Sequence, residues 1–339
     1  MVHGSDNGMS RRRVFAAGGA LASVLTGTGV SAAAGLPGGG PGADRGQGTG
    51  AGGGKPLAPV VTNTAAWRPV ADVLGRPGAL AGGRTVYRVT FPRSDLTVSS
   101  HGVTGLSQAS YAAFARYPDG RTMVMGDLVA TERELQRVTD ALHAHGLHQT
   151  AVHKHLLAHR PPLWWSHFHG LSPDALALAR AVRAGLDATA TPGYAPAEDT
   201  AASTAPPLDL DTAAIDAALG AKGSAGSGAY RFAFARRETV TDHHRVVPPA
   251  MGVTTALTFH PVGRGRAAVT GDFVMIADEV QRVIAALRHG GISIVELHNH
   301  ALRDEPRLFY LHFWAVDDAV RLARTLRTAK AATNVVPAT

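Results

Sequence analysis

Two stretches of the chain carry the same residue pattern, 145 positions apart. Residues 146–170 read GLHQTAVHKHLLAHRPPLWWSHFHG, and residues 291–315 read GISIVELHNHALRDEPRLFYLHFWA. Extended back to Gly126 and Gly271, the two segments share 17 identities in 45 aligned pairs without a gap. Self-similarity of this length indicates one structural unit that occurs twice. The repeat predicts module 1 at 67–190, a linker at 191–210 and module 2 at 211–332.

The first module predicts a small antiparallel sheet covered by helices. Thr131 followed by Glu134 has the form of a capping box at the start of a helix, and Gly146 is suited to end that helix. Alternating apolar residues and turn sequences predict the strands. In chain order we expect an opening strand at 87–91, strands at 109–117 and 121–129, a helix, strands at 147–155 and 163–170, and a helix opened by Ser172.

After the opening strand this order is ββαββα, which a ferredoxin-like βαββαβ unit gives when its last strand moves to the front. Helices that cover one face of an antiparallel sheet are the natural packing for such an order. We therefore predict an α+β fold of two tandem, permuted ferredoxin-like modules. The modules are expected to join edge to edge or face to face.

Histidine is concentrated in the repeated segments, because eight of the 17 histidines lie within 143–169. In the second copy, His298 and His300 are two residues apart on a predicted strand, so both side chains point to one face. If the hairpin folds about 304–307, His312 falls opposite or diagonal to His298. Three neutral imidazoles suit Zn, Cu, Ni or Fe. We predict two metal sites: His298, His300 and His312, and the corresponding His153, His155 and His167.

Repeated acidic residues are further candidates. Glu134 and Glu279 are candidate catalytic bases for a metal-dependent enzyme, but a capping box explains both without any chemistry. Asp127 and Asp272 are candidates for the ligand pocket or the metal, and a turn explains them equally well.

Aromatic residues surround the predicted sites. Strand alternation places Trp165 and Tyr310 on the histidine face, where they form either an apolar wall for a ligand or part of the core. The part of the chain predicted to fold contains neither a glycine-rich phosphate loop nor a nucleophile elbow. We therefore expect no nucleotide cofactor.

The N-terminus has the order of a twin-arginine signal peptide. Arginines and Phe15 precede a weakly apolar run at 16–30 and small residues at the end. We expect residues 1–34 to direct export, residues 35–66 to form a disordered Gly-rich linker, and the product to be secreted or associated with the envelope. The chain has no cysteine, so we expect no disulfide, Cys-ligated metal or lipid anchor. No later stretch is apolar enough to predict a transmembrane segment.

The formal net charge of +7 is scattered and forms no basic stripe with interleaved aromatics. The sequence therefore predicts no nucleic-acid partner. A small-molecule or cell-envelope ligand stays open, and the sequence leaves the oligomeric state undetermined.

The second copy resembles the LppY/LpqO-like family of exported bacterial proteins, a domain of unknown function. The resemblance covers roughly residues 67–330 over both copies, and it implies a secreted or envelope protein but no activity. The family is named after lipoproteins, and this chain departs from them in having no cysteine. The residues that carry it are 271–274, 295–300 and 306–315, above all His298-Asn299-His300 paired with Leu311-His312-Phe313-Trp314.

Three functions follow from these patterns. The first is a protein that binds a transition metal through its histidine triads. The second is a metal-dependent hydrolase or oxidoreductase that uses the same histidines. The third is an envelope-associated structural module, in which the histidines form a hydrogen-bond network.

Overall fold

Residues 54–195 and 208–338 are described by the computed structural model of the chain. The expected signal peptide at 1–34 lies outside these residues, as do most of the linker expected at 35–66 and part of the linker expected at 191–210. From Leu57 onward the chain is bound to the folded part, because the Leu57 N–H donates to the carbonyl of His244 at 3.1 Å. The first linker therefore ends before residue 57.

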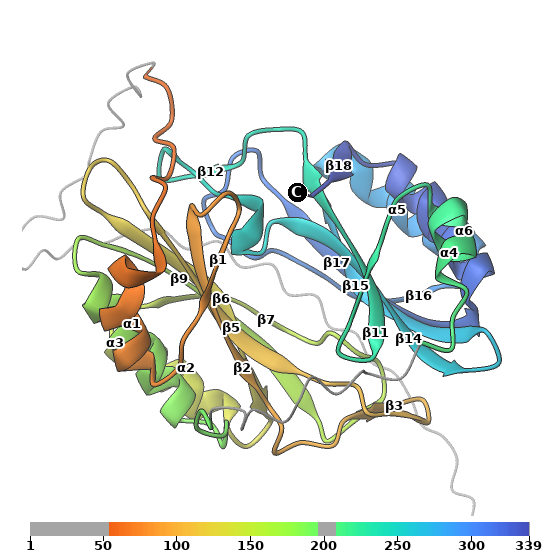
Figure 1. The fold of residues 1–339 in the computed structure, drawn as a ribbon, viewed down its shortest axis with the longest axis horizontal. Helices are drawn as coiled ribbons and strands as arrows, with labels where there is room; N and C mark the ends of the chain where they lie inside the picture. The colour runs from red at the N-terminus through yellow and green to blue at the C-terminus, as the bar shows by residue number, and fades with distance from the viewer. Residues whose placement is uncertain (1–53, 196–207, 339) are drawn as a thin grey trace, which may run out of the picture. The chain divides into compact units, whose positions relative to one another are not determined.

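Module 1 contains a six-stranded antiparallel sheet in the order β1-β2-β5-β6-β9-β7 (Figure 1). A smaller, three-stranded sheet has the order β4-β3-β8. The strands are β1 Ala79–Ala81, β2 Val86–Pro92, β3 Ser99–Ser100, β4 Val103–Thr104, β5 Ala109–Arg116, β6 Thr122–Thr131, β7 His148–His153, β8 His159–Arg160 and β9 Leu163–Ser172. The helices are η1 Thr64–Trp67, α1 Arg68–Leu74, α2 Leu135–Ala144 and α3 Ala175–Asp187.

Module 2 repeats this plan with the strand order β10-β11-β14-β15-β17-β16, and β18 pairs with β11. A separate hairpin, β12 with β13, extends from the chain between β11 and β14. The strands are β10 Ser224–Gly226, β11 Ala229–Arg236, β12 Thr241–Asp242, β13 Arg245–Val246, β14 Thr254–Gly263, β15 Arg266–Met275, β16 Ser293–His298, β17 Phe309–Asp318 and β18 Val335–Pro337. The helices are α4 Thr212–Leu219, η2 Pro249–Met251, α5 Ala277–His289 and α6 Ala319–Ala331.

Each sheet is buried on both faces. Helices α1 to α3 enclose one apolar core with the first sheet, and α4 to α6 enclose another with the second sheet (Figure 1). The helix-free faces pack on each other, because one core cluster joins Met123 to Tyr310 and another joins Trp165 to Trp314. The predicted mixture of antiparallel sheets and helices in two repeated modules is confirmed, and the modules meet face to face.

Two repeated glycines are explained by the close approach of neighbouring strands. A Cβ atom on Gly126 would lie 2.1 Å from the carbonyl oxygen of Tyr111, and one on Gly271 would lie 2.0 Å from that of Ala256. Any side chain at these positions would push the strands apart.

Two local predictions were wrong. Helix α2 begins at Leu135, and Thr131 is the last residue of β6, so Thr131 does not cap the helix through its side chain. The strands β7 and β16 end at His153 and His298, so His155 and His300 lie in the loops that follow.

Hydrogen bonds between the modules hold the segment that follows β16. The Thr150 hydroxyl donates to the carbonyl of His300 at 2.7 Å, and the Asn299 amide donates to the carbonyl of Thr150 at 3.0 Å. The backbone that follows β16 is thus hydrogen bonded to β7 of the other module. Within the described residues, no helix is long and apolar enough to cross a membrane.

Candidate metal site

Six histidines gather where the helix-free faces of the two sheets meet. The rings pair across the modules with centroid separations of 3.5 Å for His153 with His298, 3.9 Å for His155 with His312 and 4.1 Å for His167 with His300. The two triads that the sequence predicted as separate sites therefore form a single cluster, which we call the central cluster. Its members are His153, His155, His167, His298, His300 and His312.

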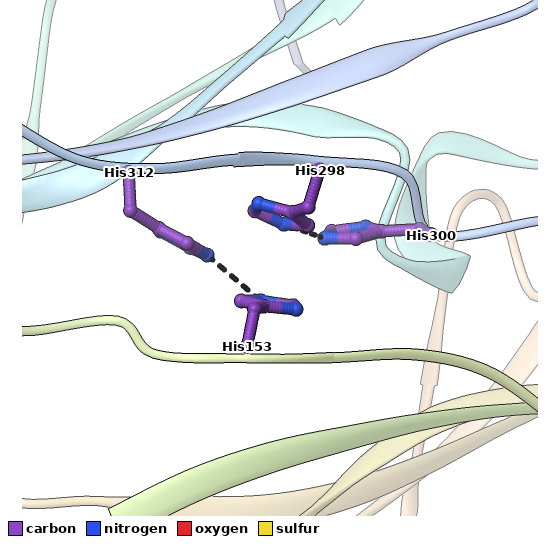
Figure 2. Close-up of side chains that lie close together, drawn as sticks. All are labelled: His153, His298, His300 and His312. Atoms are coloured by element: carbon purple, nitrogen blue, oxygen red, sulfur yellow. Dashed lines mark hydrogen bonds between the residues drawn. The ribbon is translucent and has the colours of Figure 1, made fainter. Parts of the chain in front are cut away.

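Four of these histidines form a group that could hold one metal ion. His153, His298, His300 and His312 each offer a ring nitrogen, and these four atoms lie within 4.8 Å of one another (Figure 2). The Nε2 atoms of His298 and His300 are 3.1 Å apart, and those of His153 and His312 are 3.2 Å apart. Nitrogens that share a tetrahedral metal ion at 2.0–2.1 Å are about 3.3 Å apart, so these separations fit.

His153 also belongs to a second possible group. His153, His155 and His167 bring their ligand atoms within 4.8 Å of one another. This is the triad that the sequence predicted for the first copy. His153 is thus the residue that the two groups share.

The ring of His312 is oriented for metal binding by its backbone neighbour. Its Nδ1 lies 2.9 Å from the carbonyl oxygen of Gly271, and a carbonyl oxygen can only accept, so Nδ1 carries the proton. The lone pair of Nε2 therefore points toward His153. Metal-ligating histidines almost always donate their other ring N–H to such an acceptor.

Burial keeps the imidazoles of the central cluster neutral. It lowers the pKa of His167 to about 3 and that of His312 to about 4, with repulsion between His167 and His312 adding to the shift of His167. Burial, reinforced by repulsion between the rings, also lowers the pKa of the other four residues: His153, His155, His298 and His300. Neutral imidazole is the form that binds a metal.

Several buried ring nitrogens have no hydrogen-bond partner among residues 54–195 and 208–338. An unpartnered buried polar atom destabilises a fold by about 1–3 kcal/mol, and such atoms are rare in native proteins. A ligand that donates to or accepts from these atoms would remove that cost. The atoms concerned in the central cluster are Nδ1 of His153 and His298 and Nε2 of His155 and His167.

Asp127 and Asp272 lie beside the cluster, within strands β6 and β15 and not in turns. The Asp272 Oδ2 is 3.6 Å from the Nε2 of His300, and the Asp127 Oδ2 is 3.9 Å from the Nε2 of His167. Burial raises the pKa of Asp127 to about 7, against the effect of the nearby Arg88 cation. Burial likewise raises the pKa of Asp272.

A cavity of about 320 Å³ opens beside the two carboxylates. Its lining includes charged, polar and apolar residues of both modules. Arg88 of β2 and Arg231 of β11 also line this cavity, and neither was a predicted site residue. The histidines that line it are His155, His167, His260, His300 and His312.

Glu134 and Glu279, the predicted bases, belong to a different part of the structure. Glu134 accepts from the Arg93 guanidinium at 3.0 Å and from the N–H groups of Thr131 and Ala190, both at 2.7 Å. Burial disfavours its ionised form, but these bonds outweigh burial and lower its pKa.

Glu279 has the equivalent set of partners. It accepts from Arg236 at 2.6 Å and from the N–H groups of Ile276 and Asn334. The two carboxylates accept hydrogen bonds from a buried arginine and from backbone N–H groups, and neither lines the cavity beside the central cluster. The sequence offered one overlooked signal, since Arg93 and Arg236 are themselves repeated, 143 positions apart.

Trp165 and Tyr310 lie on the histidine face, as strand alternation predicted. Trp165 stacks on His155 with ring centroids 4.1 Å apart, and Tyr310 stacks on His300 at 3.5 Å. Both are almost fully buried and neither lines the cavity. Their rings thus pack against the histidines that follow β7 and β16.

The chain was compared with solved structures, curated proteins and protein families. The solved structures that align with the chain include a trimeric bacterial microcompartment shell protein, PduB, and EtuB from Clostridium kluyveri. The first is 12% identical over 77% of this chain and 95% of that chain, with a TM-score of 0.20. The second is 9% identical over 77% and 94%, with a TM-score of 0.19. Likeness at these TM-scores carries no argument about this chain.

No curated protein matches the chain. A family model matches it twice, at residues 68–188 and 213–332, and these segments make up most of the chain. The chain therefore belongs to the family described as Domain of Unknown Function (DUF1259), of which it holds two tandem copies.

Proposed function

We propose that this protein binds a transition-metal ion in the central cluster between its modules. The observation that carries the proposal is the convergence of His153, His298, His300 and His312, with four ring nitrogens within 4.8 Å. The Gly271 carbonyl, which fixes the tautomer of His312, supports it. A set of nitrogen ligands with no thiolate suits Zn, Cu, Ni or Fe(II).

A metal-dependent enzyme on the same histidines is the second candidate, and the cavity favours it. A tetrahedral ion held by three histidines keeps one position open for water or substrate. His155 and His167 reach the cavity, as do two carboxylates and two arginines. Asp127, with its pKa near 7, is suited to proton transfer there, in place of the glutamates expected from the sequence.

A purely structural role is the third candidate. The close Nε2 pairs, His298 with His300 and His153 with His312, would then be N–H···N hydrogen bonds. The convergence of four neutral imidazoles in one buried place is the arrangement that nitrogen-ligated metal ions use, and for this reason we place metal binding first.

Metal content after purification of the full chain tests the proposal. The protein is loaded with Zn, Cu, Ni or Fe(II), passed through a desalting column and analysed for metal. We expect His153→Ala to bind about one ion per chain less than the wild type, and the control His143→Ala, which alters an exposed histidine of α2, to bind like the wild type. Less than about 0.1 ion per chain with every metal would overturn metal binding at this cluster.

Three further proposals concern cellular location, family resemblance and strand topology. Twin-arginine export of residues 1–34 is supported by the order of arginines, apolar run and small residues. The resemblance to LppY/LpqO-like exported proteins agrees with that address. A permuted ferredoxin-like topology is supported in each module by the strand orders β5-β6-β9-β7 and β14-β15-β17-β16.

A further inference from the structure

We propose a second transition-metal site, formed by His169, Asp242 and His243. His169 lies on β9 of module 1, whereas Asp242 and His243 lie at the end of β12 and in the turn that follows, in module 2. Each residue offers one ligand atom, and the three atoms lie within 4.8 Å of one another. None of the three belongs to the central cluster. We call this group the hairpin site.

The carboxylate of Asp242 lies between the two imidazoles. Its Oδ1 is 3.6 Å from the Nε2 of His169 and is hydrogen bonded to the Nδ1 of His243. The two rings are parallel within 4°, with centroids 5.6 Å apart. Ligands of one tetrahedral ion at 2.0–2.2 Å are about 3.3 Å apart, so small side-chain rotations would bring the three atoms onto a shared ion.

His169 points an unused nitrogen into this group. The residue is 5% exposed, and its Nε2 has no hydrogen-bond partner in the described part of the chain. Asp242 is buried as well, at 3%. A buried nitrogen lone pair facing a buried carboxylate is unfavourable unless a proton or a cation lies between them.

The backbone of the turn that contains His243 has an energetically unfavourable conformation. His243 and His244 both have positive φ values, 48° and 58°, as the two central residues of a type I′ hairpin turn must. Asn-Gly is the usual pair at these positions, and other side chains are strained there.

Contacts from both sides hold this turn. Arg245 donates to the carbonyl of His243 at 2.7 Å and forms an ion pair with Asp119 of module 1. The Leu57 N–H donates to the carbonyl of His244. The hairpin is therefore fixed against module 1 with the ring of His243 directed at Asp242.

The ligand type differs from that of the central cluster. Two imidazoles and one carboxylate suit Zn²⁺ or Fe²⁺, with open positions left for water or a small ligand. The His243 side chain is 38% exposed, so the hairpin site faces solvent on one side. An ion there would join β9 of module 1 to the β12–β13 hairpin of module 2.

Zn²⁺ titration of the metal-free full chain by calorimetry tests the hairpin site, and Co²⁺ absorption reports its coordination. The key variant is His243→Ala, whose exposed position spares the fold. His244→Ala is the matched control, because it is exposed, lies in the same turn and is outside the group. We expect His243→Ala to lose one equivalent, or at least about tenfold in affinity, and His244→Ala to bind like the wild type.

His153→Ala separates this proposal from the previous one. An equivalent that survives in His153→Ala and disappears in His243→Ala supports the hairpin site, whatever happens at the central cluster. Equal binding by the wild type, His243→Ala and His244→Ala overturns it, and the three residues then form a hydrogen-bonded contact only. His169→Gln checks the result from the other module, since it should lose the same equivalent.

Discussion

Replacing Glu134 by alanine should leave the guanidinium of Arg93 buried without its main counter-charge. The Arg93 side chain is 0% exposed, and Asp95, its other carboxylate partner, is 22% exposed. Breaking a buried ion pair by removing one partner typically destabilises a protein by about 3–5 kcal/mol. Asp95 retains part of the pairing, so we expect a loss of about 3 kcal/mol, a large share of the roughly 5–15 kcal/mol of a typical domain.

Urea unfolding of Glu134→Ala, followed by circular dichroism, measures this loss. The neighbouring Glu132→Ala is the control, because Glu132 is exposed, and it should change stability by less than about 0.5 kcal/mol. Metal content per folded chain should stay at the wild-type value in both variants. A loss below about 1 kcal/mol, or metal binding abolished in a folded Glu134→Ala protein, would refute the view that this glutamate is structural.

Three other predictions address titration, packing and export. Burial, with Arg231 adding repulsion, lowers the pKa of His260 to about 4, below its unfolded value of about 6.5. Between pH 7.5 and 5 the unfolded chain therefore takes up a proton at His260 that the folded chain does not, and the free energy of unfolding falls. His260→Gln should therefore lose about 1 kcal/mol less than the wild type over that range in urea unfolding, and equal losses would contradict it. Gly271→Ala places a Cβ against a backbone carbonyl of β14 and should lower the free energy of unfolding by about 1–3 kcal/mol. Gly193 has open space around it, so Gly193→Ala should leave stability unchanged. Similar melting temperatures for the two variants would contradict this prediction. Arg12→Lys with Arg13→Lys should retain the precursor in the cytoplasm, as cell fractionation would show, and unchanged export would exclude the twin-arginine route.

The histidines were predictable from sequence, but their union in one cluster was not. The alternation of apolar and polar residues shows which face of a strand is buried only when the other face is exposed to solvent. Strand β6 is buried on both faces along nearly all of its length. The small residues Ala112, Ala113 and Ala115 of β5 are the sequence trace of a sheet covered on both sides. Without knowing which faces meet, the sequence predicted two triads where the structure has one cluster.

The hairpin site was beyond the reach of the internal comparison for a different reason. A repeat highlights residues that both copies keep, and the counterpart of His169 in the second copy is Trp314. Asp242 and His243 lie in a hairpin that the aligned block does not include. A site formed by one copy with an insertion of the other therefore leaves no repeated signal.

The surroundings of Trp314 explain why the hairpin site has no counterpart on β17. Trp314 is 4% exposed, and its ring lies 5.9 Å from that of His101 in a stacked arrangement, so the place equivalent to His169 is filled by an indole. The central cluster lies where the two modules meet and takes equivalent histidines from each, so loss of one copy's set would leave only half the ligands. The hairpin site takes only His169 from the repeated strands, because Asp242 and His243 belong to the β12–β13 hairpin. Exchange of His169 for tryptophan should accordingly remove the hairpin site and leave the central cluster's metal content unchanged, which elemental analysis of His169→Trp would establish; loss of both metals would mean that the two sites are one.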